Sequence, residues 1–414
     1  MIAKVTRMHE FRRMMPKNKW LQQWTVVCLA LIAVGLVFSR AVLSVGCGLV
    51  LLPFFFQASA MHNRRMIFTG LLLILLPVFI SGCWSADIRN WAESITVRLP
   101  LVSIALGCSA VIFSRKNWLL VACVYLISIA IGCVWSLWQY AIDPAAMQAS
   151  YLKAKVLPTL ADQDYVRFSW MVMIGVLIAF RSFALIRSRL SKYILIALIV
   201  FFIIYLHILA AKTGLLCLYA CAIVYMIDLM IRQRKWKTGL AWMAAAVMII
   251  FVAYQSLPTL RNRVQYVRFD FSLYSKNGSA PGYNDAARWV SLRAGYELTN
   301  AHPFTGVGFG DMRSAINAWH EKNLPSSLAY ERFLPADEWL VYGTGSGWPG
   351  MLCFTAGLLF LLYATATRQI LSVLFTITAV IPLITDDTLE GQIGAVLLGF
   401  ISFFGQQNPT THYE

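Results

Sequence analysis

The sequence predicts an all-α polytopic membrane protein, and three observations support this prediction. Hydrophobic residues make up 59% of the 414 positions, whereas soluble domains average about 45–50%. Apolar runs long enough to cross a bilayer core recur along the chain. Basic residues gather in alternate connections between these runs, which is the pattern of the positive-inside rule.

About twelve apolar runs are present, and each is expected to form one membrane-spanning helix. They fall at 21–39, 42–60, 67–84, 99–114, 118–138, 168–184, 193–210, 214–231, 238–256, 340–364, 370–385 and 391–405. The first two runs lie close together behind a basic leader, which indicates a helical hairpin rather than a cleaved signal peptide. All nine cysteines fall inside the runs. They serve there as small apolar residues and show no metal-ligand spacing.

The distribution of charge predicts the orientation. With the N-terminus in the cytoplasm, the cytoplasmic segments hold 19 of the 35 basic residues and three acids, and the other side holds 16 of each. The whole net charge of +16 then lies on one side, with both termini cytoplasmic. Basic groups such as RQRKWK at 232–237 are explained by topology and anionic headgroups, so no nucleic-acid partner is indicated.

The chain is expected to divide into three parts. Residues 1–256 hold the first nine spans, 257–339 form one large outer loop, and 340–414 hold the last three spans and a cytoplasmic tail. Loops of that length are usually functional or disordered. The many aromatic residues of this loop favour a packed structure, so the chemistry is expected there.

Parts of the large loop are predicted to be helical. Asp285 is suited to cap a helix over 286–298, and a second helix is expected over about 311–322. Gly306, Gly308 and Gly310 lie between them, without the preceding strand or the spacing of a dinucleotide fingerprint. These glycines therefore predict a tight turn with unusual backbone angles.

Four basic residues on the outer side are candidates for binding an anionic group: Arg167, Lys212, Arg263 and Arg288. Arginine suits anionic oxygens because its planar fork donates two hydrogen bonds and stays charged. Arg263 follows the ninth span, and Arg288 lies in the first loop helix. Lys212 and Arg167 stand at the ends of apolar spans, where contact with lipid headgroups is the alternative interpretation.

Asp337 and Glu338 stand where the loop re-enters the membrane. Paired acids at a helix start usually act as caps. The functional alternative is a general base in a partly desolvated cleft. The loop also contains His302 and His320, but neither has a serine or cysteine partner at a motif spacing, so a Ser-His-Asp triad is not supported.

Together with this layout, the segment NAHPFTGVGFG at 300–310 resembles the O-antigen ligase/polymerase superfamily of bacterial inner-membrane glycosyltransferases. The ligases end their loop with a histidine, a polar residue, nine further residues and then Gly-x-x-Gly or a variant of it. Gly347-Trp-Pro-Gly350 matches that end. Counting back places Ala336 in the histidine position and Asp337 in the next.

The resemblance implies transfer of a glycan from undecaprenyl pyrophosphate to a lipid A-core hydroxyl at the periplasmic face, without metal or other cofactor. It assigns Lys212, Arg263 and Arg288 to the pyrophosphate, with Arg288 also in the catalytic group beside Asp337 and Glu338. Three explanations are open for Ala336 in the histidine position. The chain is an engineered inactive variant, one of the two acids takes the role, or His320 folds into the site. The acids are favoured because they lie within two residues.

Two other functions are weighed against the ligase. A polymerase of the same superfamily shares the layout, and a deletion strain would distinguish the two by the lipopolysaccharide that it makes. A transporter or flippase commonly has ionisable residues at mid-membrane and inverted repeats. The spans are nearly free of charge at their centres and no repeat is visible, which disfavours it.

Overall fold

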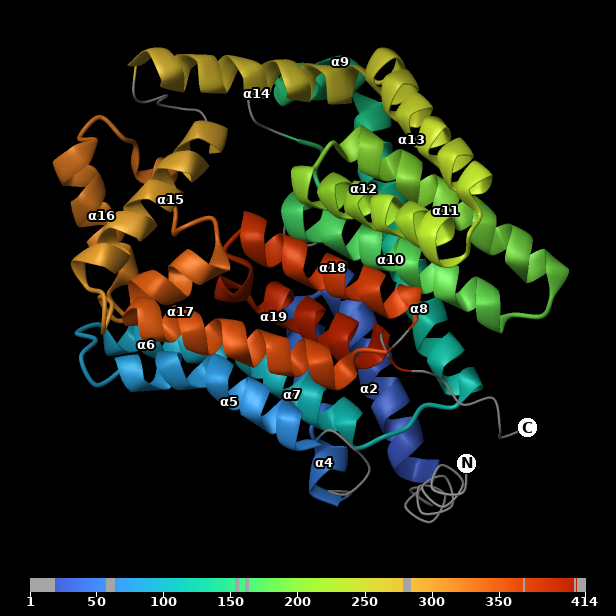
Figure 1. Cartoon of the computed structure of the whole chain (residues 1–414), viewed down its shortest axis with the longest axis horizontal. Helices are drawn as coiled ribbons and strands as arrows, with labels where there is room; N and C mark the ends of the chain where they lie inside the picture. Colours follow the sequence, from blue (N-terminus) through green and yellow to red (C-terminus); the bar gives the residue numbers. More distant parts are fainter. Residues whose placement is uncertain are drawn as a thin grey trace.

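The computed structural model describes residues 19–56, 64–152, 156–160, 164–277, 284–367, 369–405 and 407. Over these residues the chain forms helices and no strand (Figure 1). The helices are α2 (Lys19–Phe38), α3 (Arg40–Leu49), α4 (Leu52–Phe56), α5 (Arg64–Ser81), α6 (Ile88–Thr96), α7 (Leu99–Ser109), α8 (Arg115–Ile142), α9 (Pro144–Tyr151), α10 (Tyr165–Leu185), α11 (Arg189–Leu209), α12 (Lys212–Ile227), α13 (Trp236–Ser256), α14 (Pro258–Asn277), α15 (Asn284–Ala301), α16 (Met312–Asn323), α17 (Glu338–Thr365), α18 (Ile370–Thr385) and α19 (Gln392–Gly399).

The apolar helices agree in position with the predicted spans. In the described part of the chain, eight helices are long and apolar enough to cross a membrane, and four shorter apolar helices cover Arg40–Phe56, Arg65–Ser81, Ile370–Thr385 and Gln392–Gly405. Each of the twelve predicted runs overlaps one of these helices. The protein is therefore a multi-pass helical membrane protein, and the number of crossings stays a prediction.

Close contact between α5 and α17 organises one side of the bundle (Figure 1). The two backbones meet at a pair of glycines, since a Cβ added to Gly70 would lie 2.8 Å from the carbonyl oxygen of Gly357. Small residues at such crossings let transmembrane helices pack through their backbones. This packing fixes the start of α17, where the predicted acids Asp337 and Glu338 lie.

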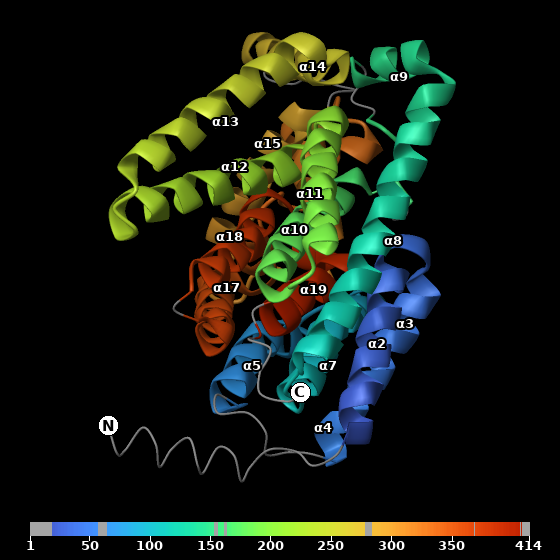
Figure 2. The ribbon, with the colours of Figure 1, turned by 90° about the vertical axis from the view of Figure 1, so that its right-hand side faces the viewer.

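The large loop is mostly helical. Its first helix, α14, was not predicted; it runs beside α9 and joins α13 to the rest of the loop across one edge of the molecule (Figures 1 and 2). The predicted helices over 286–298 and 311–322 are present as α15 and α16. Asp285 is not the N-cap that the sequence suggested, because it lies inside the first turn of α15 and its carboxylate contacts two basic side chains.

The glycine-rich turn docks against an unwound turn of α17. Ser346 and Gly347 leave the helical conformation, and Val307 N–H donates to the freed carbonyl oxygen of Thr344 at 2.8 Å. Gly306 and Gly308 have φ angles of +64° and +95°. The tight-turn prediction is confirmed, since only glycine adopts such angles without strain.

Replacing Gly306 by alanine is expected to destabilise this junction. The new Cβ would lie 2.4 Å from the backbone nitrogen of Ser346, in addition to the strain at positive φ. We expect a loss of about 1–3 kcal/mol, measured as a lower midpoint of thermal unfolding in detergent. Gly48→Ala is the control, because no atom lies within 4 Å of a Cβ at that position. Equal midpoints for the two variants would contradict the prediction.

Candidate functional site

Five basic side chains gather at one end of the helix bundle, and we call them the cation cluster: Arg98, Arg167, Lys212, Arg263 and Arg288. Arg98 immediately precedes α7, Arg167 lies in the first turn of α10, and Lys212 opens α12. Arg263 and Arg288 come from the loop helices α14 and α15. Each of the five contacts at least one carboxylate.

Lys212 and Arg263 share one carboxylate of α15. Lys212 Nζ lies 2.8 Å from Asp285 Oδ1, and Arg263 Nη2 lies 3.6 Å from the same oxygen. Arg263 is buried, with its guanidinium 5.0 Å from the ring centre of Tyr266. Its Nε and Nη1 groups have no hydrogen-bond partner among the residues that the structure describes. A buried arginine with two unused donors is suited to an anionic ligand, because unpaired buried donors are costly.

The short link between α18 and α19, residues 386–390, supplies acids to the other arginines, and we call it the acidic connection. Arg288 Nη1 lies 3.1 Å from Asp386 Oδ1. Arg167 Nη1 lies 2.5 Å from Asp164 Oδ2, and its Nη2 donates to the carbonyl oxygen of Asp387 at 3.3 Å. Burial, followed by the neighbouring Asp386, raises the pKa of the Asp387 carboxyl well above its ordinary value.

Arg98 ties the acidic connection to α17. Its guanidinium forms ion pairs with Glu390 and, at 3.6 Å, with Glu338, and both Arg98 and Glu338 are fully buried. Glu338 Oε2 also accepts a hydrogen bond from the backbone N–H of Leu389 at 2.9 Å. Phe309 of the glycine-rich turn lies over the guanidinium at 5.0 Å. The contacts of Glu338 and Arg98 therefore join the start of α17, the acidic connection and the glycine-rich turn.

The contacts form one continuous set. Asp285 and Arg288 lie one turn apart on α15, and Asp386 and Glu390 lie on the same connection. Helices α7, α10, α12, α15 and α17 all begin at this end. Helix N-termini carry partial positive charge and free N–H groups, which favour anions. The arrangement is therefore suited to bind a large multivalent anion.

Asp337 caps α17, and Ala336, the residue before it, lies against α15. Asp337 Oδ1 accepts the N–H of Leu340 at 2.9 Å, so this acid caps α17 as the sequence suggested. Burial raises the pKa of the Asp337 carboxyl above its ordinary value, against the lowering effect of its backbone donors. The N–H of Ala336 donates to Ser291 Oγ at 3.1 Å. Ser291 is one helical turn from Arg288, so Ala336 lies near the cation cluster.

His320 lies on α16 among residues of its own loop segment. Its Nδ1 lies 3.2 Å from Ser327 Oγ, and its ring packs against Trp319. Burial, followed by Arg332, lowers the pKa of the imidazole. The structure brings Lys212, Arg263, Arg288 and Arg167 together, but it does not bring His320 to them.

Sequence reasoning missed several members of the site: Arg98, Asp386, Asp387 and Glu390, and the pairing role of Asp285. One signal was present. The acidic connection has three acids in five residues, in a chain with 19 acids in all. Acids between two apolar spans indicate that buried basic residues pair with them, because an unpaired charge close to the membrane interior is costly.

No protein-family model matches this chain, and no curated protein is similar enough in sequence to count as a relative. The family assignment therefore stays a prediction that depends on the residues and on the geometry described above.

Proposed function

We propose that this protein is an O-antigen ligase of the bacterial inner membrane. It would transfer a glycan from undecaprenyl pyrophosphate to a lipid A-core hydroxyl at the periplasmic face, with twelve spans and both termini in the cytoplasm. The observation that carries the proposal is the gathering of Lys212, Arg263 and Arg288 around the start of α15. These residues come from three helices, and they are the ones that the resemblance assigns to the pyrophosphate.

The chemistry needs charge neutralisation and one proton acceptor. The acceptor hydroxyl oxygen attacks the anomeric carbon, the bond from that carbon to the pyrophosphate oxygen breaks, and the undecaprenyl pyrophosphate leaves. Arg263, Arg288 and Lys212 would stabilise the charge that develops on the leaving group. Of the two predicted acids, Asp337 suits the base, because burial raises its pKa and no ion pair engages it among the described residues, whereas Glu338 is held in a buried ion pair.

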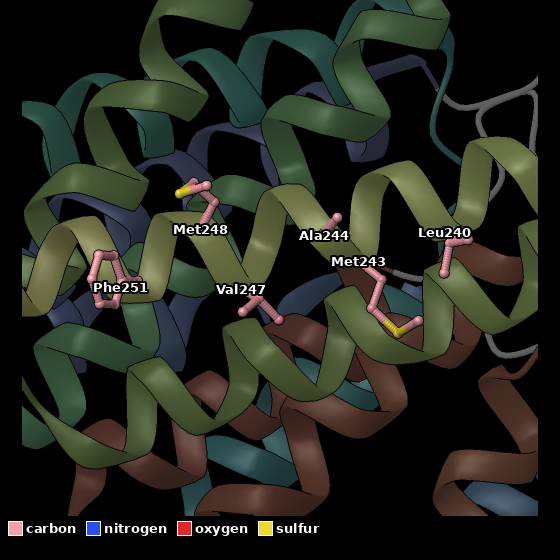
Figure 3. Close-up of a pocket in the computed structure, with 6 residues that line it drawn as sticks. All are labelled: Leu240, Met243, Ala244, Val247, Met248 and Phe251. Carbon is pink, nitrogen blue, oxygen red and sulfur yellow. The ribbon is translucent and has the colours of Figure 1, made fainter.

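An apolar groove along α13 supports a lipid-linked donor. One part is an open apolar face of α13 itself (Figure 3), formed by Leu240, Met243, Ala244, Val247, Met248 and Phe251. A second part of about 450 Å³ lies between α12, α13 and α14. Val247 and Phe251 line both parts, so the groove is continuous.

The groove ends beside the cation cluster. Leu260 and Val264 of its second part flank Arg263 on α14, and Leu215 lies one turn from Lys212 on α12. A cationic end followed by an apolar groove matches a lipid with an anionic headgroup and a long hydrocarbon chain.

The direct test is transfer in vitro. Purified protein is expected to join a glycan from undecaprenyl pyrophosphate to lipid A-core without ATP or added metal. A strain lacking the protein is expected to make bare lipid A-core and to accumulate lipid-linked polymer. Single repeat units attached to the core in that strain would instead indicate a polymerase, and normal lipopolysaccharide would reject both functions.

Substitution at the histidine position tests which group accepts the proton. We expect Asp337→Asn to reduce transfer by about 10²–10⁴-fold, the usual contribution of a general base. The Ala336→His variant is expected to transfer glycan at the same rate as the wild type. Glu321→Gln, at an exposed acid of α16, is the control. A large gain from Ala336→His, with Asp337→Asn fully active, would show instead that the chain is a ligase inactivated at that position.

A further inference from the structure

An exposed aromatic stripe runs along the outer side of α15. Trp289 and Tyr296 are each 55% exposed, although most neighbouring residues of the helix are buried. Their spacing of seven residues places them on the same side, about 10.5 Å apart along the axis. Arg293 lies between them on that side. We call Trp289, Arg293 and Tyr296 the α15 stripe.

The stripe begins at the cation cluster. Asp285, which contacts Lys212 and Arg263, lies four residues before Trp289 and therefore on the same side of the helix. Trp289 is about 6 Å along the axis from that contact, and Tyr296 is about 16.5 Å from it. A ligand with its anionic group at Lys212 and Arg263 can extend along the stripe.

Polar groups alternate with the aromatic rings. Arg293 Nε lies 2.8 Å from Glu297 Oε1, and Glu297 Oε2 accepts the indole N–H of Trp319 at 2.8 Å. Arg293 is a charged donor between the two exposed rings, and Glu297 is a charged acceptor next to Tyr296. A sugar ring has the same mixture, since its C–H face is apolar and its rim carries hydroxyl groups. A lipid chain would place this charged pair against hydrocarbon, which disfavours a lipid as the occupant.

We propose that the α15 stripe binds the glycan of the lipid-linked donor, with Trp289 under the sugar nearest the pyrophosphate and Tyr296 under a sugar further along. This inference rests on the proposed function, because the pyrophosphate bound at the cation cluster determines the direction in which the glycan extends along α15. The negative face of each aromatic ring attracts the positive C–H groups of the sugar. Stacking of this kind tolerates different sugars, whereas Arg293 and Glu297 select the orientation of the hydroxyl groups.

Donor length gives the test. With a donor that carries one sugar, Trp289→Ala is expected to raise KM by roughly tenfold, the scale of an aromatic contact, and Tyr296→Ala to have no effect. With a donor that carries a long glycan, both variants are expected to raise KM while kcat stays unchanged. Trp289→Phe and Tyr296→Phe are expected to retain low KM values. Tyr330→Ala, at an exposed aromatic residue outside α15, is the control.

A binding measurement separates this inference from the proposed function. Glycan released from its carrier is expected to show saturation-transfer NMR signals with the wild-type protein in nanodiscs, and to lose them with Trp289→Ala/Tyr296→Ala. That result would support the stripe even if no transfer were found. Unchanged KM and NMR signals in both variants would overturn the proposal. Quenching of Trp289 emission by brominated lipids, identified by comparison with Trp289→Phe, would also overturn it and place the stripe against the bilayer.

Discussion

Replacing Arg288 or Arg263 by glutamine is expected to lower glycan transfer by about 10²–10³-fold, the effect of removing one fixed donor from a developing negative charge. Both side chains are held in place by neighbouring acids, and Arg263 has two buried donors that lack partners. Such fixed groups need no reorganisation when the pyrophosphate leaves. The readouts are the rate in vitro and the amount of long-chain lipopolysaccharide in cells, with membrane insertion checked separately.

Two further variants make the result specific. Arg263→Lys keeps the charge and loses the planar fork, so we expect activity between wild type and Arg263→Gln. Arg313→Gln removes an exposed arginine of the same loop and is expected to be fully active. Normal long-chain lipopolysaccharide in both Arg288→Gln and Arg263→Gln would reject the proposed role of the cation cluster.

Replacing Arg98 by methionine is expected to have the largest effect on stability. The side chain is fully buried and forms ion pairs with Glu338 and Glu390. Methionine would leave two carboxylates at that position without their cation. Removing one partner of a buried ion pair lowers the free energy of unfolding by about 3–5 kcal/mol, because the charge of the other partner is left uncompensated. We expect a lower midpoint of thermal unfolding in detergent and reduced amounts of protein in the membrane.

Removing the charges together provides the check on this explanation. The triple variant Arg98→Met/Glu338→Gln/Glu390→Gln is expected to recover much of the lost stability, since replacing a whole buried ion pair is often nearly neutral. Arg89→Met, at an exposed position of α6, is expected to match wild type. A single Arg98→Met variant as stable as wild type would show that the two acids do not depend on Arg98.

The helices could be predicted because hydropathy is a local property. Runs such as 118–138 and 370–385 contain enough apolar residues to identify α8 and α18 without any knowledge of their neighbours. Helix α14 was missed because it is polar, with arginines at 261, 263 and 268, and its stability comes from packing against α9 and α13. Propensity is a weak guide when tertiary contacts decide.

The site could be predicted only in part. The basic residues stood out in apolar surroundings, and four of the five members of the cation cluster were named. Their partners were not, because the pairs Lys212–Asp285 and Arg288–Asp386 join residues far apart in sequence. Arg98 was missed for the same reason, since its acids follow it by more than two hundred positions. A single sequence can indicate that acids such as those of the acidic connection need buried partners, but it does not identify the partners.

The pairing of every cation with a carboxylate has a consequence for selectivity. A site whose cations are paired with carboxylates exerts little long-range attraction on inorganic phosphate or chloride. Apart from the two unused donors of Arg263, a ligand must therefore compete with carboxylates for the cations, and only one that offers several anionic oxygens in the right geometry gains enough to do so. Discrimination then arises from the cost of exchanging counterions, which penalises small anions more than a pyrophosphate held by its lipid in the membrane plane.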